Sequence, residues 1–233
     1  MKIHIITAFP DLLKGPLDES IIRRGQEKQL VEILIHNLRD YSEDKHKRVD
    51  DYPYGGAPGM ILKPEPIFNC IEAVLNQYRI ESPQLIFLTP QGKTYNQARA
   101  IELAQQEQLI FLCGHYKGID ERVRLYWQME EISIGDYVLT GGELPALVII
   151  DSVIRLIPGV ISDLNSAKTD SFYENKLDSP YYTRPEIFRN MKVPEVLLSG
   201  HHAEIKKWQQ QQALERTMTL RRDLLKTDND DQK

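Results

Sequence analysis

Residues 130–160 read EEISIGDYVLTGGELPALVIIDSVIRLIPGV, and this stretch decides the fold of the chain. Residues 130–138 have the composition of a β-strand, whereas residues 143–157 form a long apolar helical stretch that Pro158-Gly159 ends. Glycines lie between the two, where the chain must turn from strand to helix. The stretch therefore predicts a strand, a glycine loop and a helix in direct succession.

Alternating segments of the same kind extend from this stretch toward the N-terminus. Short apolar runs that indicate strands lie at 3–9, 30–38, 84–88 and 109–113, and helical spacing is found at 66–78, 96–106 and 120–127. Continuous apolar strands joined by helices are typical of a mostly parallel sheet that is covered on both faces. We therefore predict one α/β domain over residues 1–160.

The chain changes character after this domain. Residues 161–174 are polar, have no sustained period and indicate a linker, which contains Asp170. Beyond it, residues 204–225 have strong helical spacing, and the acidic tail 226–233 is expected to fray. We predict a small all-α domain over residues 175–233.

Composition narrows the class of protein. The chain has 233 residues, 41% of them hydrophobic and 27% charged, as in ordinary globular proteins. It contains no apolar run long enough to span a membrane, and its first residues lack the order of a signal peptide. Cys70 and Cys113 lie far apart without metal-ligand spacing, which favours a reducing compartment and argues against structural zinc. We therefore expect a cytoplasmic protein with no membrane partner.

The net charge of −5 does not by itself indicate a nucleic-acid binder. Phosphate contacts need a local density of Lys and Arg, and three clusters provide it: residues 45–48, Lys206-Lys207, and Arg216 with Arg221-Arg222. Each cluster alone is also typical of a solvated surface. Composition therefore leaves RNA binding open.

Two nucleotide-binding motifs are absent. Gly92-Lys93-Thr94 lies between a strand and a helix, as in a phosphate-binding P-loop, but Phe87 stands where that motif needs its first glycine. No GxGxxG segment follows any predicted strand. The sequence therefore argues against an NTPase and against a Rossmann dehydrogenase.

Glycine loops directly follow three predicted strands, at 88–92, 113–118 and 134–142. In open α/β sheets ligands bind beyond the carboxyl ends of the strands, and glycines there let the backbone approach a flat ligand. The three loops together indicate a backbone-lined pocket for an adenosine-containing ligand. Three plain structural turns remain the alternative.

Several other polar residues have no function that can be read from the residues alone. Asp170, Ser171 and Arg155 would each be ordinary solvated side chains, and the segment 54–60 could be an elaborate turn. The adjacent pair His201-His202 has no third ligand nearby, so it predicts no metal site.

Taken together, these segments resemble the bacterial tRNA (guanine-N1)-methyltransferases, the TrmD family within the SPOUT superfamily, nearly end to end. The resemblance rests on VDDYPYGGAPGM (49–60), LTPQG (88–92), CGHYKGIDERV (113–123), residues 132–160, DSFYENKLDSPYYTRP (170–185) and VPEVLLSGHHAEIKKW (193–208). It implies a SPOUT-type, mostly parallel sheet with a deep trefoil knot, one of the rare knotted folds.

The resemblance also implies an activity and partners. The family transfers a methyl group from S-adenosyl-L-methionine to N1 of the guanosine 3′ of the anticodon, tRNA position 37. The knot loops would hold the donor, and the helical domain would bind the tRNA anticodon stem-loop. Family members are homodimers with shared active sites, so a symmetric dimer is expected.

Site residues are implied one by one. Asp170 matches the proposed general base, and Arg155 matches the residue thought to stabilise negative charge on guanine O6. His46, Asp50, Gly59 and Ser171 match positions expected at the tRNA. The positions that match contacts of the donor are Leu88, Thr89, Pro90, Gly92, Gly114, Tyr116, Ile134, Gly135, Asp136, Tyr137, Val138, Leu139, Gly141, Gly142 and Pro145.

The chain departs from the family pattern at three positions. His115 and Lys117 stand where Arg and Glu are usual, and Ala57 replaces a glycine. The glutamate is associated with a dependence on magnesium, and a lysine cannot ligate a cation. Mg²⁺ is therefore in doubt as a cofactor here.

Two other functions compete with this reading. A ribose 2′-O-methyltransferase of the same superfamily would transfer the methyl group to ribose, but Asp170 argues against it. A non-catalytic RNA-binding relative would bind the donor without transferring its methyl group, and His115 and Lys117 are what favour it.

Overall fold

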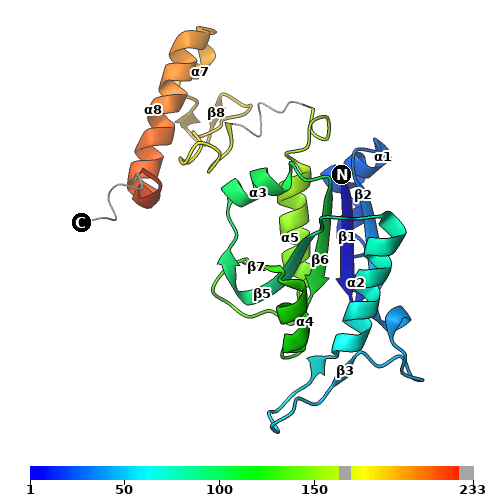
Figure 1. Ribbon diagram of the computed structural model, residues 1–233. Coiled ribbons are helices and arrows are strands. Elements are labelled where there is room, and N and C mark those ends of the chain that lie inside the picture. The colour runs from blue at the N-terminus through cyan, green and yellow to red at the C-terminus, as the bar shows by residue number, and fades with distance from the viewer. Residues whose placement is uncertain (163–168, 226–233) are drawn as a thin grey trace. The chain divides into compact units, whose positions relative to one another are not determined.

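The computed structural model describes residues 1–162 and 169–225 of the chain (Figure 1). It divides into two compact units, Met1–Ser162 and Asp163–Lys233, and each is described here by itself. Residues 163–168 of the predicted linker and the predicted frayed tail 226–233 lie outside the described residues. No described helix has the length and apolar character needed to cross a membrane.

The first unit is built on a five-stranded sheet with the order β2-β1-β6-β5-β7, in which every pair is parallel. The sheet and its helices confirm the prediction of a mostly parallel α/β fold. The strands are β1 (Lys2–Thr7), β2 (Glu32–Asn37), β5 (Gln84–Thr94), β6 (Gln108–Cys113) and β7 (Glu130–Ser133).

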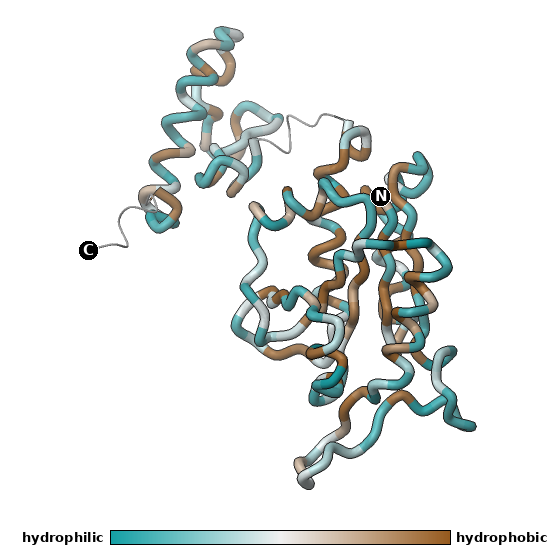
Figure 2. The backbone as a smooth tube through the Cα atoms, viewed as in Figure 1, coloured by the Kyte–Doolittle hydropathy of each residue, from teal (hydrophilic) through white to brown (hydrophobic). Residues whose placement is uncertain are grey.

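Helices cover both faces of this sheet because successive side chains of each strand point to opposite sides. In β6, Leu109 and Phe111 pack toward one core, whereas Ile110 and Leu112 pack toward the other. The first core is closed by α1 (Ser20–Glu27), α3 (Gln97–Leu103) and α5 (Glu143–Ile154), and the second by α2 (Pro64–Tyr78) and α4 (Glu121–Trp127). Figure 2 shows the apolar residues concentrated along the strands and α5.

Two strands end five or more residues from the predicted position, whereas β1 and β2 end within two residues of it. The strand expected at 84–88 continues to Thr94, with an irregular register between Leu88 and Lys93. The strand expected at 130–138 ends at Ser133 instead, because the following residues turn toward the loop after β6. A short antiparallel pair, β3 (Asp50–Asp51) and β4 (Ile61–Leu62), carries the glycine-rich segment 54–60.

The second unit is not all helical, so that prediction was wrong. It contains α7 (Glu195–Leu198), α8 (His202–Leu220) and a 3-10 turn at Arg222–Leu225, but also two short strands, β8 (Ile187–Phe188) and β9 (Met191–Lys192). The strands form where Arg189 and Asn190 adopt positive φ, which lets the chain reverse within two residues. The helix predicted over 204–225 ends at Leu220.

Candidate functional site

A cavity of about 530 Å³ lies in the first unit at the carboxyl ends of β5, β6 and β7. Its walls come from the segments 87–91, 114–118 and 132–142, joined by Pro145 and by Gly59-Met60. Ligands of open α/β sheets bind in this position, beyond the ends of the strands. The three glycine loops of the sequence therefore surround one cavity, and they are not three separate turns.

Most of the positions predicted to contact the methyl donor line this cavity. The exceptions are Gly92 and Asp136. A Cβ atom on Gly92 would lie 2.4 Å from the backbone carbon of Glu131, so this glycine allows β7 to approach the irregular part of β5 closely. Residues that were not predicted also line the cavity: Met60, Phe87, Gln91, His115, Lys117, Gly118, Ile132, Ser133 and Thr140.

Backbone contacts join the loops around the cavity. The N–H of Gly142 donates to the carbonyl of Gly114 at 2.8 Å, and His115 and Gly141 form an isolated antiparallel bridge. A Cβ atom on Gly142 would lie 2.7 Å from the Cα of Cys113, closer than real Cβ atoms approach. Glycine is therefore required at position 142 by space, since the loop after β7 is pressed against the end of β6.

A buried carboxylate lies at the base of these loops. Glu143 is 1% exposed in the first turn of α5, and its Oε1 accepts a hydrogen bond from the hydroxyl of Thr7 at 2.6 Å. The Thr7 hydroxyl in turn accepts from the N–H of Phe9. The helix N-terminus favours a negative charge here. Glu143 thus joins α5 to the end of β1, a contact that the sequence analysis missed because glutamate is rarely buried.

Polar atoms near the cavity lack partners within the described residues. Nδ1 of His115 and Oε2 of Glu143 are both buried without a hydrogen bond there, and a Cβ atom on Gly141 would meet both side chains within 3 Å. Buried polar atoms of this kind are expected to find a partner in a bound ligand or in water. His115 lines the cavity, and its ring packs against that of Phe9 with the centroids 4.2 Å apart.

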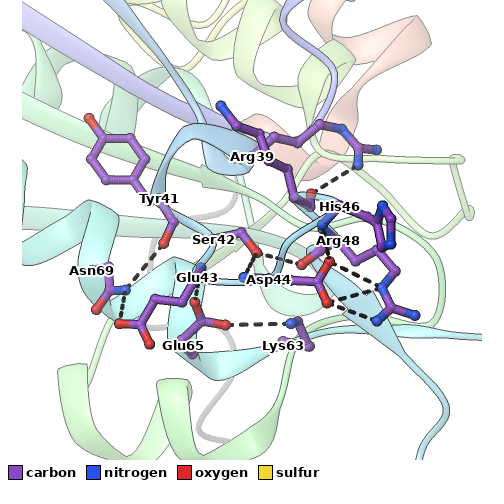
Figure 3. Close-up of polar contacts among 11 residues, drawn as sticks. Arg39, Tyr41, Ser42, Glu43, Asp44, His46, Arg48, Lys63, Glu65 and Asn69 are labelled. Carbon is purple, nitrogen blue, oxygen red and sulfur yellow. Dashed lines mark hydrogen bonds and ion pairs between the residues drawn. The ribbon is translucent and has the colours of Figure 1, made fainter.

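The predicted tRNA contact His46 lies in a turn that Asp44 organises (Figure 3). Oδ1 of Asp44 accepts from the N–H of His46 at 2.7 Å, and Oδ2 accepts from Nη2 of Arg48 at 2.8 Å. The Arg48 guanidinium and then the His46 N–H hold the pKa of Asp44 well below its usual range. The carboxylate therefore stays charged and keeps the exposed residues 45–48 in one arrangement.

Two other predicted tRNA contacts lie close to the cavity. Gly59 lines it directly, and the position of a Cβ on Gly59 would be 3.0 Å from Cγ of Lys117. Asp50 lies in β3 and faces Tyr116, another cavity residue. Burial raises the pKa of Tyr116, and the carboxylate of Asp50 raises it further. The β3–β4 segment thus reaches the rim of the cavity.

Neither of the two predicted catalytic residues is among the residues that line this cavity. Arg155 follows the last residue of α5, about 18 Å along the helix from Glu143 at 1.5 Å per residue. Asp170 belongs to the second unit, where it lines a cavity of about 480 Å³ together with residues that include Tyr181 and Lys206. Ser171, a predicted tRNA contact, accepts the N–H of Asp178 at 3.0 Å.

Comparisons with known proteins identify the class to which this fold and cavity belong. A family model described as "tRNA (Guanine-1)-methyltransferase TrmD" matches residues 1–227. A tRNA (guanine-N(1)-)-methyltransferase of Clostridioides difficile is 49% identical over 230 residues, 99% of this chain and 100% of that protein. One of Halalkalibacterium halodurans is 53% identical over 97% of this chain and 91% of its own length.

A solved structure agrees with these matches. The crystal structure of tRNA (m1G37) methyltransferase from Aquifex aeolicus superimposes with a TM-score of 0.77 at 39% identity, covering 97% of this chain and 94% of that one. The fold and its cavity are therefore those of an RNA-modifying methyltransferase. The chain belongs to the tRNA (guanine-1)-methyltransferase family.

Proposed function

We propose that the chain transfers the methyl group of S-adenosyl-L-methionine to N1 of the guanosine 3′ of the tRNA anticodon, position 37. The cavity at the ends of β5, β6 and β7 carries this proposal, because the loops predicted to hold the donor converge on it. The Aquifex relative is described by its title as an m1G37 methyltransferase. Family membership and the cavity together favour base methylation over ribose methylation or RNA binding alone.

The cavity suits an adenosine-containing donor. Its walls are largely loop backbone and apolar side chains, which fit a flat base. The bound donor would supply an electrophilic methyl group on its sulfonium. The residues of the chain must then hold guanine N1 in line with that methyl group, since orientation contributes much of the rate.

Asp170 would act as the general base. N1 of neutral guanine carries a proton, so its lone pair becomes available only when a base removes that proton. A carboxylate is a weak base for this proton, and a guanidinium that stabilises the charge on O6 compensates for the weakness. Arg155 is the residue proposed for that role, in accordance with the resemblance described above.

The position of Arg155 supports a shared site in a homodimer. Arg155 follows the last residue of α5, about 18 Å along the helix from Glu143, and it is not among the residues that line the cavity of the same chain. In a symmetric dimer, a second copy can supply to each cavity what its own chain holds elsewhere. We propose that the catalytic pair and the donor cavity are assembled from two chains.

The chain crossing at the cavity supports the trefoil knot. In the sheet β5 lies between β6 and β7, yet the loop after β7 is bonded to the loop after β6 through Gly142 and Gly114. The residues that leave β7 must therefore cross the carboxyl end of β5. We propose that the segments after β5, β6 and β7 form the knot.

The residues at the cavity rim do not fit a magnesium ion. Lys117 lines the cavity beside Gly59, and its ammonium group has no free lone pair for a metal. Across the described ranges 1–162 and 169–225, no three or more His, Cys, Asp or Glu side chains gather as ligands. We propose that Lys117 supplies a fixed positive charge at this rim and that the reaction does not depend on Mg²⁺.

A methylation assay tests the function. Purified protein with labelled donor is given an unmodified tRNA transcript with guanosine at position 37, and a matched transcript with adenosine there. We expect methylation of the guanosine transcript alone, mapped to N1, at an equal rate with magnesium or with chelator. Methyl groups on ribose would select the ribose methyltransferase. Donor binding without any transfer would select the RNA-binding relative.

Replacement of Asp170, the proposed general base, tests the mechanism. Asp170→Asn is expected to lower kcat by about 100-fold or more, which is the usual contribution of a general base, while donor affinity stays unchanged. Asp18→Asn, at an exposed aspartate of the first unit, is the control. An equal loss in both variants, or no loss in Asp170→Asn, would contradict the role of Asp170.

A further inference from the structure

Residues 181–192 form the longest continuous exposed segment among the described residues of the second unit. Every residue from Tyr181 to Lys192 is exposed, although five of them are large and apolar: Tyr181, Tyr182, Ile187, Phe188 and Met191. Apolar side chains that stay in contact with water over so long a run usually mark a binding surface. We call this segment the exposed ribbon.

The tip of the exposed ribbon has a defined shape. Ile187 pairs with Lys192 and Phe188 pairs with Met191, and the two-residue turn between the strands has positive φ at both positions. The N–H of Val193 donates to the carbonyl of Glu186 at 2.9 Å, which extends the pairing. Directly paired residues share a face, so Phe188 and Met191 present one face and Ile187 and Lys192 the other.

The base of the exposed ribbon is fixed to the rest of its unit. The hydroxyl of Tyr181 donates to Oδ2 of Asp178 at 2.6 Å, and the ring of Tyr182 lies 6.5 Å from that of Trp208 in α8. Nearby, the N–H of Leu177 donates to the hydroxyl of Thr217 in the same helix. The ribbon is therefore held at its base while both faces of its tip remain exposed.

The side chains of the ribbon suit nucleotides. The ribbon contains three cations, Arg184, Arg189 and Lys192, and one carboxylate, Glu186, so it is positive within a chain of net charge −5. The guanidinium of Arg189 lies 5.4 Å from the ring centroid of Phe188. Single-stranded RNA is bound by this combination, in which aromatic rings and Arg planes stack on bases and cations contact phosphates.

The helix α8 is a weaker candidate for the same role. Its basic residues Lys206, Lys207 and Arg216 are interspersed with Glu204 and Glu215, and Arg221 at its end forms an ion pair with Asp223. It also presents no exposed Phe, Tyr or Trp ring. The helix therefore lacks the large aromatic rings that the exposed ribbon offers for stacking on bases.

We propose that the exposed ribbon binds unpaired nucleotides of the tRNA substrate, with Phe188 stacked on a base and with Arg184, Arg189 and Lys192 at phosphates. This inference rests on the function proposed above. A second copy of the chain is the less favourable occupant, because it would bury three cations against one carboxylate. The ribbon binds the nucleic acid, and the cavity of the first unit binds the donor.

The test uses the full chain with donor present and measures tRNA affinity at several salt concentrations. Phe188→Leu keeps an apolar side chain but removes the ring, and it is expected to weaken tRNA binding about tenfold without changing the salt dependence. Phe188→Tyr should restore the affinity. The double variant Arg189→Gln with Lys192→Gln should lower the slope of log K against log salt by about 1.4, as expected for two phosphates of a single strand.

A matched double variant decides between the ribbon and the helix. Lys207→Gln with Arg216→Gln removes two exposed cations from α8 and is expected to change affinity and slope less than the ribbon variant. Equal effects of the two double variants would show that tRNA affinity depends only on the net charge of the chain, and this result would overturn the proposal. A change in sedimentation of Phe188→Leu without tRNA would also overturn it, since the ribbon would then join two copies.

The outcomes separate this inference from the proposed function. If the wild-type chain methylates the guanosine transcript while all ribbon variants bind tRNA like the wild type, only the inference fails. If the wild-type chain neither binds nor methylates either transcript, the proposed function fails first. Donor affinity and circular dichroism of each variant show that the fold is retained.

Discussion

The two units of the chain differ in how much of themselves they bury. Among the described residues, every buried hydrophobic side chain except Ala213 belongs to the first unit, which has a core on each face of its sheet. The second unit buries Ala213, Ser179 and Thr217 and leaves apolar side chains such as Phe188 and Met218 exposed. A small unit with so little core has little stability of its own. The first unit is therefore self-sufficient, whereas the second is suited to being covered by a partner.

The two proposed binding surfaces differ in the same way. The cavity proposed to bind the donor is lined largely by loop backbone, so its shape depends on the packing of the sheet beneath it. The exposed ribbon is a projecting surface of side chains on a two-residue turn. Substitutions in the first unit should thus change both stability and donor binding, whereas those in the ribbon should change RNA binding alone.

The largest expected effect is on the stability of the first unit. Phe111→Ala removes a fully buried ring from the centre of the sheet and should lower the free energy of unfolding by about 3–5 kcal/mol. Met218→Ala, at an exposed residue of α8, should change it by less than about 0.5 kcal/mol. Urea unfolding followed by Trp127 fluorescence in a Trp208→Phe background measures this, because each unit contains one tryptophan.

Fluorescence of Trp208 in a Trp127→Phe background gives the complementary measurement. The second unit should unfold at a lower urea concentration than the first. Phe111→Ala should bring the urea midpoint of the first unit closer to that of the second. Coincident transitions of the two tryptophans in the wild-type chain would show that the units unfold together, and the contrast between them would then be lost.

The next effect depends on pH and belongs to the first unit. His4 is fully buried, and burial, followed by the neighbouring His36, lowers its pKa from 6.5 to about 4. Nδ1 of His4 lies 3.0 Å from Nε2 of His36. Because the unfolded chain takes up the proton at a higher pH, stability is fully present above about pH 6.5. It is then lost as the pH falls toward 4, by about 3 kcal/mol.

Variants at two histidines check the source of this pH dependence. His4→Leu should flatten the curve of unfolding free energy against pH between 6.5 and 4. His201→Leu, at an exposed residue of the second unit, should leave that curve unchanged. A wild-type stability that is constant over this range would show that His4 does not titrate with folding.

The smallest effect concerns the donor cavity. Gly142→Ala places a methyl group 2.7 Å from the Cα of Cys113 and must move the loop after β7. Overpacking of this kind costs about 1–3 kcal/mol, so donor affinity should fall about tenfold or more. Gly25→Ala, whose new methyl group meets only side-chain atoms at 3.5 Å or more, serves as the control. Calorimetric titration with the donor measures both, and equal affinities would show that the loop can relax.

The sequence predicted the fold where a periodic pattern determines the structure. The strand at 109–113 and the long helix after residue 142 were predicted, because a buried strand and a buried helix each contain a continuous run of apolar residues. The sequence did not predict the ribbon, because strands of two residues are too short to show any alternation. The turn between them has positive φ at Arg189 and Asn190, and an arginine rarely adopts positive φ. The boundaries of β5 and β7 depend on an irregular register that no local pattern encodes.

The candidate site was predictable to a similar degree. Glycines after strands indicated where backbone approaches closely, and their loops do converge on one cavity. Glu143 and the unpartnered ring nitrogen of His115 were missed, because their roles come from burial between segments far apart in sequence. The roles of Asp170 and Arg155 rest on the resemblance, so they remain predictions.

The two cysteines give this architecture a chemical consequence. Both are free and buried, Cys70 in α2 on one side of the sheet and Cys113 at the end of β6 on the other. Burial raises the pKa of Cys70 to about 12 and that of Cys113 well above its usual value. The reactive thiolate is therefore scarce at neutral pH. We therefore expect both thiols of the folded enzyme to react slowly with oxidants and alkylating reagents. The rate at which each thiol is alkylated then reports how often its own face of the sheet opens.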